Sequence, residues 1–295
     1  MAAFVPGVAR SADRRGSRRR PSALHAWMWM LPALLVFLVF YVVPLGQMFW
    51  RSVSDGGLGT QHYAHVFGSS TYINVLVSTM QVGLVVCGVC LVVGYPLAYF
   101  LSRVRGKWLQ VALMFVLIPF WISSLVRNYA WIVILNRRGI VNTVLINLGI
   151  IDEPLSLMYN MTGVIIGMSY TLMPIMIITL YAAMKGIDPQ YIRASNSLGA
   201  SPQQTFWRVF VPMSVPGIWA GSLLVFIIAI GFFVTPAILG GGRVPMMATV
   251  IESQVRGVLN WGFGSALAAV LLISVILVYF AFDRLLGIEY LIRQR

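Results

Sequence analysis

Long stretches without a charged residue dominate this sequence and limit what it can fold into. About 20 helical residues are needed to cross the ~30 Å hydrocarbon core of a bilayer. Six stretches are long enough, at residues 27–50, 72–102, 108–135 (interrupted by Arg127), 154–184, 209–242 and 257–282. Only 10% of the residues are charged and the mean hydropathy is +0.85. We therefore predict an all-α membrane protein with six transmembrane helices.

The basic residues predict the orientation of these helices. If the N-terminus is cytoplasmic, then the segments before residue 27, at 103–107, at 185–212 and after residue 283 face the cytoplasm. They hold 15 of the 21 Lys and Arg residues, and the opposite loops hold five. Positive residues favour the cytoplasmic side. We predict a multi-pass protein of the bacterial inner membrane with both termini in the cytoplasm. The net charge of +13 then reflects topology and requires no nucleic-acid partner.

The same pattern divides the chain into segments. We expect a basic cytoplasmic tail at 1–26, a first transmembrane helix at 27–50, a core with five transmembrane helices at 72–286, and a cytoplasmic tail at 287–295. The first apolar stretch is too long for the apolar region of a signal peptide, so we expect an uncleaved anchor embedded in the lipid bilayer.

The cytoplasmic loop at 185–212 carries the start and stop signals of short helices. Asp188 followed by Pro189 is typical of an N-cap with proline at the first helical position. Gly199 is well suited to the position just after a helix end. These signals predict a first helix between Asp188 and Gly199.

A second helix is predicted to begin after Ser201 in the same loop. Gln204 lies three residues later and completes a capping-box pattern. We expect this helix to run through Trp207 and to end at Pro212. A linker needs no such caps, so the pattern favours a docking element over a solvated linker.

The spacing in this loop resembles that of a known family. The order R-A-S-x3-G-x9-V-x-V-P from Arg193 to Pro212 resembles the EAA-x3-G-x9-I-x-L-P motif of binding-protein-dependent ABC transporter permeases. Other segments resemble the spermidine/putrescine branch of that family: GYPLAY (94–99), RNYAW (127–131), GIVN (139–142), SLGAS (197–201) and VTPAILGG (234–241). The resemblance covers about 72–286 and implies the type I ABC importer permease (MetI-like) fold, with the loop as cytoplasmic coupling helices.

The resemblance also implies partners. The coupling helices of the family sit on an ATP-binding cassette ATPase dimer, which uses the ATP and Mg. We expect a second permease subunit, forming a heterodimer, and a periplasmic solute-binding protein docked near 137–158 and 240–260. This chain has no GxxxxGK[ST] phosphate loop, so we expect no cofactor and no catalytic residue in it. The expected ATPase-docking residues are Tyr191, Arg193, Ala194, Ser195, Leu198, Gly199, Ala200, Ser201 and Phe206.

Two positions depart from the family motif. Arg193 stands where the family usually has Glu, and Ser195 stands where it has Ala. Since like charges repel across an interface, we expect the matching ATPase to carry a complementary residue opposite Arg193.

The sequence indicates the residues of the solute path less specifically than those of the docking loop. Its candidate residues are Trp121, Arg127, Tyr170, Phe232, Phe233 and Thr235. Arg127 either serves the path, as ionisable groups at membrane depth often do, or extends toward the interface. The three residues at 232–235 either line the path or pack between helices.

The identity of the solute stays open. The resemblance favours a polyamine-like cation, such as spermidine or putrescine, passed by alternating access. The six predicted spans contain no clear acidic residue that would bind a polycation, so an opine, an amino-acid derivative or another small organic solute is the alternative.

Other functional classes have weaker support. The sequence has no HExxH or GxSxG motif, and His62 and His65 have no third metal ligand nearby. Cys87 and Cys90 lie in an apolar stretch, where two small side chains on one helix face are the simpler interpretation of a CxxC pattern. A stand-alone secondary transporter or channel is the remaining alternative. It would leave the capped loop without a role.

Overall fold

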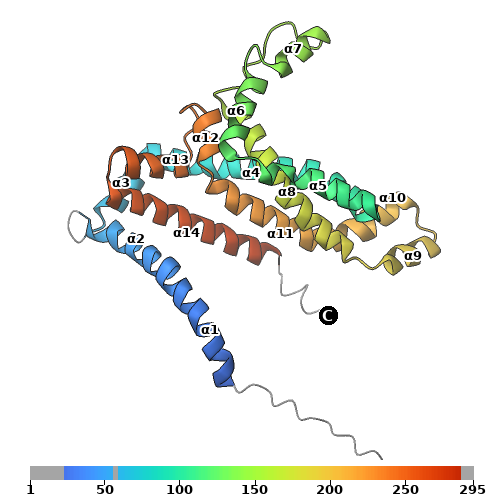
Figure 1. The fold of residues 1–295 in the computed structure, drawn as a ribbon, viewed down its shortest axis with the longest axis horizontal. Coiled ribbons are helices and arrows are strands. Elements are labelled where there is room, and N and C mark those ends of the chain that lie inside the picture. The colour runs from blue at the N-terminus through green and yellow to red at the C-terminus, as the bar shows by residue number, and fades with distance from the viewer. Residues whose placement is uncertain (1–22, 56–58, 287–295) are drawn as a thin grey trace, which may run out of the picture. The chain divides into compact units, whose positions relative to one another are not determined.

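The computed structural model describes residues 23–55 and 59–286. All regular structure in these residues is helical, which confirms the predicted all-α class (Figure 1). The predicted C-terminal tail at 287–295 and residues 1–22 of the predicted N-terminal tail lie outside the described residues. The chain forms two compact units, Met1–Gln47 and Met48–Arg295.

The first unit contains α1 (Ala23–Phe37), a π-helical turn η1 (Leu38–Val42) and the start of α2 (Val43–Ser54). The apolar side chains from Met30 to Val43 are exposed, and Met30–Ser54 is long and apolar enough to cross a membrane. Exposed apolar side chains all around a helix are typical of a membrane span. This span corresponds to the predicted first transmembrane helix.

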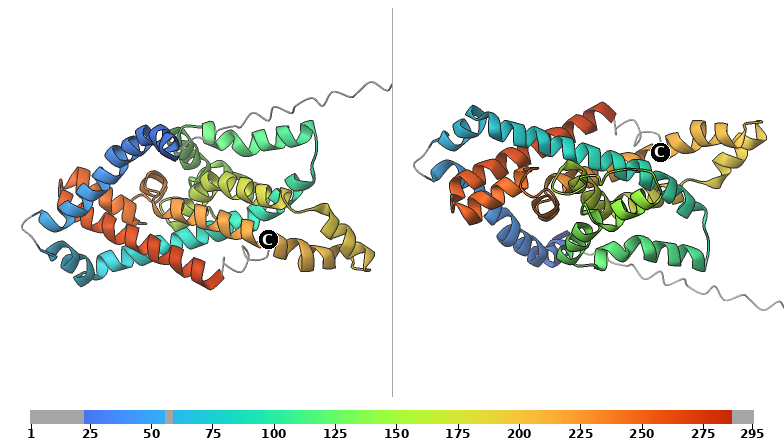
Figure 2. Two further views of the ribbon diagram at one scale, coloured as in Figure 1. Left: turned by 90° about the horizontal axis from the view of Figure 1, so that it is seen from below. Right: turned by 90° about the horizontal axis from the view of Figure 1, so that it is seen from above.

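The second unit follows as a series of helices of very different lengths. They are α3 (Gln61–Gly68), α4 (Ser70–Arg103), α5 (Lys107–Trp121), α6 (Ser124–Leu135), α7 (Ile140–Asn147), α8 (Met161–Lys185), α9 (Pro189–Ser197), α10 (Pro202–Thr205), η2 (Phe206–Phe210), α11 (Val211–Ile230), α12 (Val234–Leu239), α13 (Met247–Glu252), η3 (Ser253–Gly257) and α14 (Trp261–Leu286). Within the second unit, α4, α8 and α11 run side by side, and α9 and α10 extend beyond them at one end (Figures 1 and 2).

Five helices of the described chain are long and apolar enough to span a bilayer, and a bent pair adds a sixth. The bent pair corrects one expectation, because we predicted that the third span continues through Arg127 to Leu135. Instead α5 ends at Trp121, Ile122 and Ser123 adopt extended backbone, and the helices after the break turn by 96°. Hydroxyl side chains compete for backbone hydrogen bonds, and Ser123 and Ser124 lie at this break.

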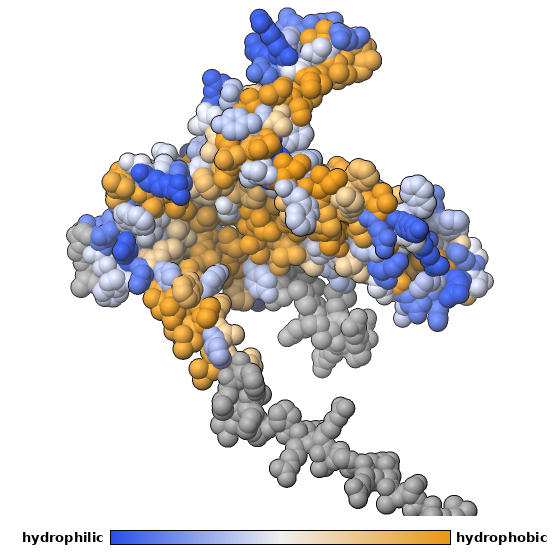
Figure 3. Space-filling view, viewed as in Figure 1, coloured by the Kyte–Doolittle hydropathy of each residue, from blue (hydrophilic) through white to orange (hydrophobic). Residues whose placement is uncertain are grey.

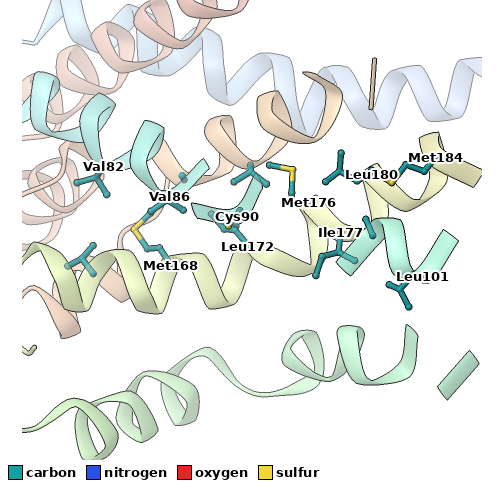
Figure 4. Packing of buried hydrophobic residues seen from close by; sticks show 14 of the residues in the cluster. Val82, Val86, Cys90, Leu101, Met168, Leu172, Met176, Ile177, Leu180 and Met184 are labelled. Atoms are coloured by element: carbon teal, nitrogen blue, oxygen red, sulfur yellow. The ribbon is translucent and has the colours of Figure 1, made fainter. Parts of the chain in front are cut away.

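The main core lies between α4, α8 and α11. Figure 4 shows Val86 and Cys90 of α4 facing Met168 and Leu172 of α8. Lipid tails are as apolar as these side chains, so close packing rather than water exclusion holds such helices together. A Cβ atom on Gly217 of α11 would lie 2.3 Å from the Ala183 Cβ of α8, so α11 can approach α8 this closely only with glycine there.

A second, smaller core joins α3, α13 and α14. Val66, Phe263 and Leu267 are buried there. A buried hydrogen bond of 2.8 Å runs from the Met247 N–H of α13 to the Thr79 hydroxyl of α4. The hydroxyl donates in turn to the Val75 carbonyl, so it acts both as an acceptor and as a donor. This pair of hydrogen bonds fixes α13 against α4.

The helix that begins at Pro202 does not end at Pro212, as we had predicted, but continues into the fifth span as far as Ile230. In a regular α-helix, a proline lacks one N–H donor and its ring clashes with the carbonyl four residues earlier. Here the Val211 N–H bonds the Phe206 carbonyl five residues earlier. This π-helical turn shifts the hydrogen-bond pattern just before Pro212, and η1 precedes Pro44 in the same way.

Candidate functional site

The first helix of the loop at 185–212 forms as its sequence predicts. The Asp188 carboxylate accepts the Gln190 N–H at 2.8 Å, and Pro189 occupies the first helical position of α9. Gly199 follows the helix with φ of +84°, a conformation that favours glycine. The position of α9 is thus fixed by local chemistry at both of its ends.

The second helix begins with the predicted capping box. The Gln204 N–H donates to the Ser201 hydroxyl at 3.3 Å, and the Ser201 N–H donates to the Gln204 side chain at 2.9 Å. Such a cap stabilises a helix by about 0.5–2 kcal/mol. Because this helix continues into η2 and α11, the cap fixes the beginning of the helix that contains the fifth span.

A partly buried polar contact, which no sequence pattern predicted, ties the two loop helices together. The Thr205 hydroxyl of α10 donates to the Asn196 side chain at 3.1 Å and lies 3.0 Å from the Ser195 hydroxyl. Thr205 is buried and Ser195 is half-buried. The hydroxyl of Ser195, where the family motif has Ala, therefore faces the loop itself. No local pattern connects residues ten apart in two helices.

The outer face of the loop, by which we mean its exposed side chains, combines large apolar residues with basic ones. The exposed fractions of Tyr191 and Leu198 are 56% and 88%, and that of Trp207, which we had not included, is 62%. Figure 3 shows this end of the second unit as hydrophilic against the apolar flank of the long helices. Among the other predicted docking residues, Arg193, Ala194, Gly199 and Ser201 are exposed, whereas Ala200 and Phe206 are half-buried.

The positive charge of this face comes from Lys185, Arg193 and Arg208, all of which are exposed. The acidic residue of the loop, Asp188, is occupied as the N-cap of α9. The face therefore combines exposed apolar anchors with cations, a composition suited to a partner surface that offers an apolar groove and carboxylates.

The predicted path residues of α5, α6 and α8 lie around the bent third span. Trp121 ends α5 and is 89% exposed. Arg127 of α6 is half-buried and donates through Nη1 to the Pro119 carbonyl at 2.8 Å, while its buried Nε has no hydrogen-bond partner among the described residues. Tyr170 of α8 packs edge-on against Trp131 with ring centroids 5.4 Å apart. Arg127 is thus engaged in holding the bend.

The other path candidates lie where α11 gives way to α12. Phe232 packs against the main core, Phe233 is 39% exposed, and Thr235 is fully buried. Thr235 lies so close to Gly167 of α8 that a Cβ atom on the glycine would be 2.9 Å from the Thr235 methyl carbon. In this conformation Thr235 packs between helices, and contact with a solute would require α12 to move.

An apolar recess of about 440 Å³ lies between α4, α5 and α8, with Tyr170 and Pro119 in its wall. The residues that line it, all of which the structure describes, include no carboxylate. No group of three or more His, Cys, Asp or Glu residues in the described part of the chain is arranged to hold a metal ion.

Known proteins resemble this chain both in sequence and in fold. The pattern of the family described as "Binding-protein-dependent transport system inner membrane component" matches residues 94–288. The spermidine/putrescine transport system permease protein PotB of Haemophilus influenzae is 35% identical over 261 residues, covering 88% of this chain and 90% of the relative. PotB of Escherichia coli K12 is 37% identical over 219 residues, covering 73% and 80%.

Two solved structures share the fold. A chain of a bacterial alginate ABC transporter, solved in complex with an alginate pentasaccharide-bound periplasmic protein, superposes with a TM-score of 0.69 at 18% identity, covering 88% of this chain and 93% of that one. A chain of the MetNI methionine ABC transporter in an inward-facing conformation gives 0.57 at 19% identity, covering 74% and 97%.

Proposed function

The chain belongs to the family of binding-protein-dependent transport system inner membrane components, and we propose that it passes a small organic solute, with polyamines favoured, across the inner membrane in an ATP-driven importer. It is a multi-pass permease subunit of the MetI-like fold. The energy would come from an ATPase dimer that binds ATP and Mg, and this chain would hold no cofactor of its own.

The capped cytoplasmic loop carries this proposal. Tyr191 and Leu198 are exposed at the polar helix α9, and Trp207 is exposed near the start of the helix that continues as the fifth span. Exposed apolar groups gathered on a polar surface mark interaction sites. We propose that this face docks on the ATPase, with Arg193 opposite a carboxylate of the ATPase.

Polyamines are favoured as solutes because the relatives with 35–37% identity are spermidine/putrescine permeases. The described parts of α4, α5, α8 and α11 contain no Asp or Glu. Aromatic faces attract cations, and the exposed rings of Trp121 and Phe233 would serve in this way. Carboxylates would come from the second permease. An opine or an amino-acid derivative is the alternative solute.

Six spans would form half of the transmembrane pathway, so we propose a heterodimer with a second permease. A periplasmic solute-binding protein would deliver the solute to the outer segments at 137–158 and 240–260. The uneven distribution of basic residues supports cytoplasmic N- and C-termini. Closure of the ATPase would displace the loop, and rigid-body rotation of the spans would then switch the pathway between inward and outward openings.

Reconstitution of the four components into proteoliposomes tests the proposal. Uptake of labelled spermidine should require ATP inside, the ATPase subunit and the binding protein outside, and a non-hydrolysable ATP analogue should abolish it. Uptake without the ATPase would instead establish a stand-alone transporter. Thermal-shift screening of the binding protein identifies the solute, since a ligand that binds only the folded state raises the melting temperature.

A further inference from the structure

Four aromatic rings and one guanidinium join the loop to the second span. We call this group the aromatic clasp: Tyr95, Tyr99 and Arg103 of α4 with Phe206 and Phe210 of η2. The Tyr99 ring meets Phe206 and Phe210 edge-on, with centroids 5.1 and 4.9 Å apart and interplanar angles of 78° and 80°. Edge-on contacts are a favoured geometry for aromatic rings.

The π-helical turn presents the two phenylalanines to Tyr99 together. The rings of Phe206 and Phe210 are nearly parallel, with an interplanar angle of 14° and centroids 6.1 Å apart. Tyr99 stands nearly perpendicular to both. A displacement of η2 along its axis therefore meets the Tyr99 ring in either direction.

Arg103 contacts both Tyr99 and Phe210. The guanidinium carbon lies 5.0 Å from the Tyr99 centroid and 5.7 Å from that of Phe210, and Nη2 donates to the Tyr99 hydroxyl at 3.1 Å. One turn earlier, the Tyr95 hydroxyl lies 2.8 Å from the hydroxyl of Ser214, a fully buried residue of α11. Rings and polar groups thus fix α4 to η2 and α11.

The clasp connects directly to the exposed face of α9. Thr205 immediately precedes Phe206, and its hydroxyl holds Ser195 and Asn196 of α9. A load applied to Arg193 or Leu198 on the outer face therefore passes through α9 to Thr205, then to Phe206, and then to Tyr99. The half-buried Ile192 of α9 packs against the main core and offers a second, apolar contact.

We propose that the aromatic clasp is the joint through which displacement of the loop moves α4, with Tyr99 as the central positioning residue. The proposal rests on the function proposed above. Tyr99 is not among the predicted docking or path residues, although Phe206 is a predicted docking residue. Loss of the Tyr99 ring should therefore leave docking intact and uncouple ATP hydrolysis from import.

The test uses the complete reconstituted importer with three variants of this chain. Tyr99→Ala removes both edge-on contacts, and Tyr99→Phe keeps the ring but loses its hydroxyl. Val92→Ala is the control, because Val92 lies on the same helix, is 73% exposed and belongs neither to the clasp nor to the lining of the apolar recess. The measured quantities are co-purification of the ATPase, ATP hydrolysis stimulated by the binding protein, and solute imported per ATP hydrolysed.

We expect Tyr99→Ala to retain the ATPase and to lower import per ATP about tenfold, the factor that corresponds to losing two ring contacts. Tyr99→Phe and Val92→Ala should stay near wild type. The proposal would be overturned by unchanged import per ATP in Tyr99→Ala, by an equal loss in Val92→Ala, or by loss of the ATPase from the complex.

If the Tyr99→Ala chain itself fails to fold in the membrane, Tyr99→Leu carries the comparison with the same deciding outcomes. The wild-type importer separates the two proposals. Absence of ATP-dependent import by the wild-type complex refutes the proposed function. Normal import by the wild type, together with unchanged import per ATP in Tyr99→Ala, refutes only the role proposed for the aromatic clasp.

Discussion

Arg127 and Pro119 meet across the break in the third span, where the guanidinium donates to the proline carbonyl at 2.8 Å. The last carbonyls of a helix lack partners within the helix, and Arg127 supplies a donor to one of them near the end of α5. The cation is therefore a part of the bend itself.

Replacement of Arg127 by Met should destabilise the permease by about 1.5–3 kcal/mol, the contribution expected of a hydrogen bond to a charged group. Thermal unfolding of the purified chain in detergent measures the loss. Arg138→Met is the control, because Arg138 is exposed in the segment after α6. A higher KM for import with an unchanged unfolding temperature would instead place Arg127 in the solute path.

Gly217→Ala should force α11 away from α8, since the added Cβ atom would lie 2.3 Å from the Ala183 Cβ. Overpacking of this kind costs about 1–3 kcal/mol. Thermal unfolding measures the effect, and Gly88→Ala is the control because nothing lies within 4 Å of its added atom. The double variant Gly217→Ala/Ala183→Gly should recover most of the loss. Failure of this rescue would show that another contact sets the distance between these helices.

Thr79→Val should leave the buried Met247 N–H without an acceptor, at a cost of about 1–3 kcal/mol. Thr79→Ser keeps the hydroxyl and should retain most of the stability. Hydrogen exchange of the amides of α13 reports the change locally, and it should accelerate in Thr79→Val alone. Equal exchange rates in both variants would contradict the role assigned to this hydroxyl.

Arg193→Glu should weaken association with the ATPase on the order of tenfold, because it reverses a charge at the proposed contact. Arg193→Lys should bind nearly as well as wild type. Arg137→Glu, which reverses an exposed charge in the segment after α6, is the matched control. A pull-down titration measures the affinities, and the effect should shrink at high salt. Wild-type binding by Arg193→Glu would exclude Arg193 as a contact.

Features governed by neighbouring residues were predictable from the sequence. The caps at Asp188 and Ser201 and the turn at Gly199 are local chemistry, and all three form as expected. The spans follow from the length of the apolar stretches. Gly217 and Gly221 form a GxxxG pattern, and in a chain with 27 glycines only the structure shows that both meet α8.

Features that depend on distant residues were not predictable. The contact between Thr79 and Met247 joins positions 168 residues apart, and neither residue has a local signal for it. The break at Ile122 lies inside an apolar stretch. Hydropathy reports only the polarity of the side chains and cannot predict where a helix changes direction. The prediction that a helix ends at Pro212 was wrong because the preceding π-helical turn accommodates the proline. Residue preferences do not reveal such a turn.

The unbroken helix from Pro202 to Ile230 has a mechanical consequence. Its 29 residues span about 43 Å, and its closest approach to α8 lies at Gly217, near its middle. If a rigid helix rotates about a point near its middle, its two ends move in opposite directions. Rocking by about 10° would carry each end about 4 Å, in opposite directions. Whatever pushes Thr205 one way would therefore swing the far end, which leads to Phe233, the other way by nearly the same amount.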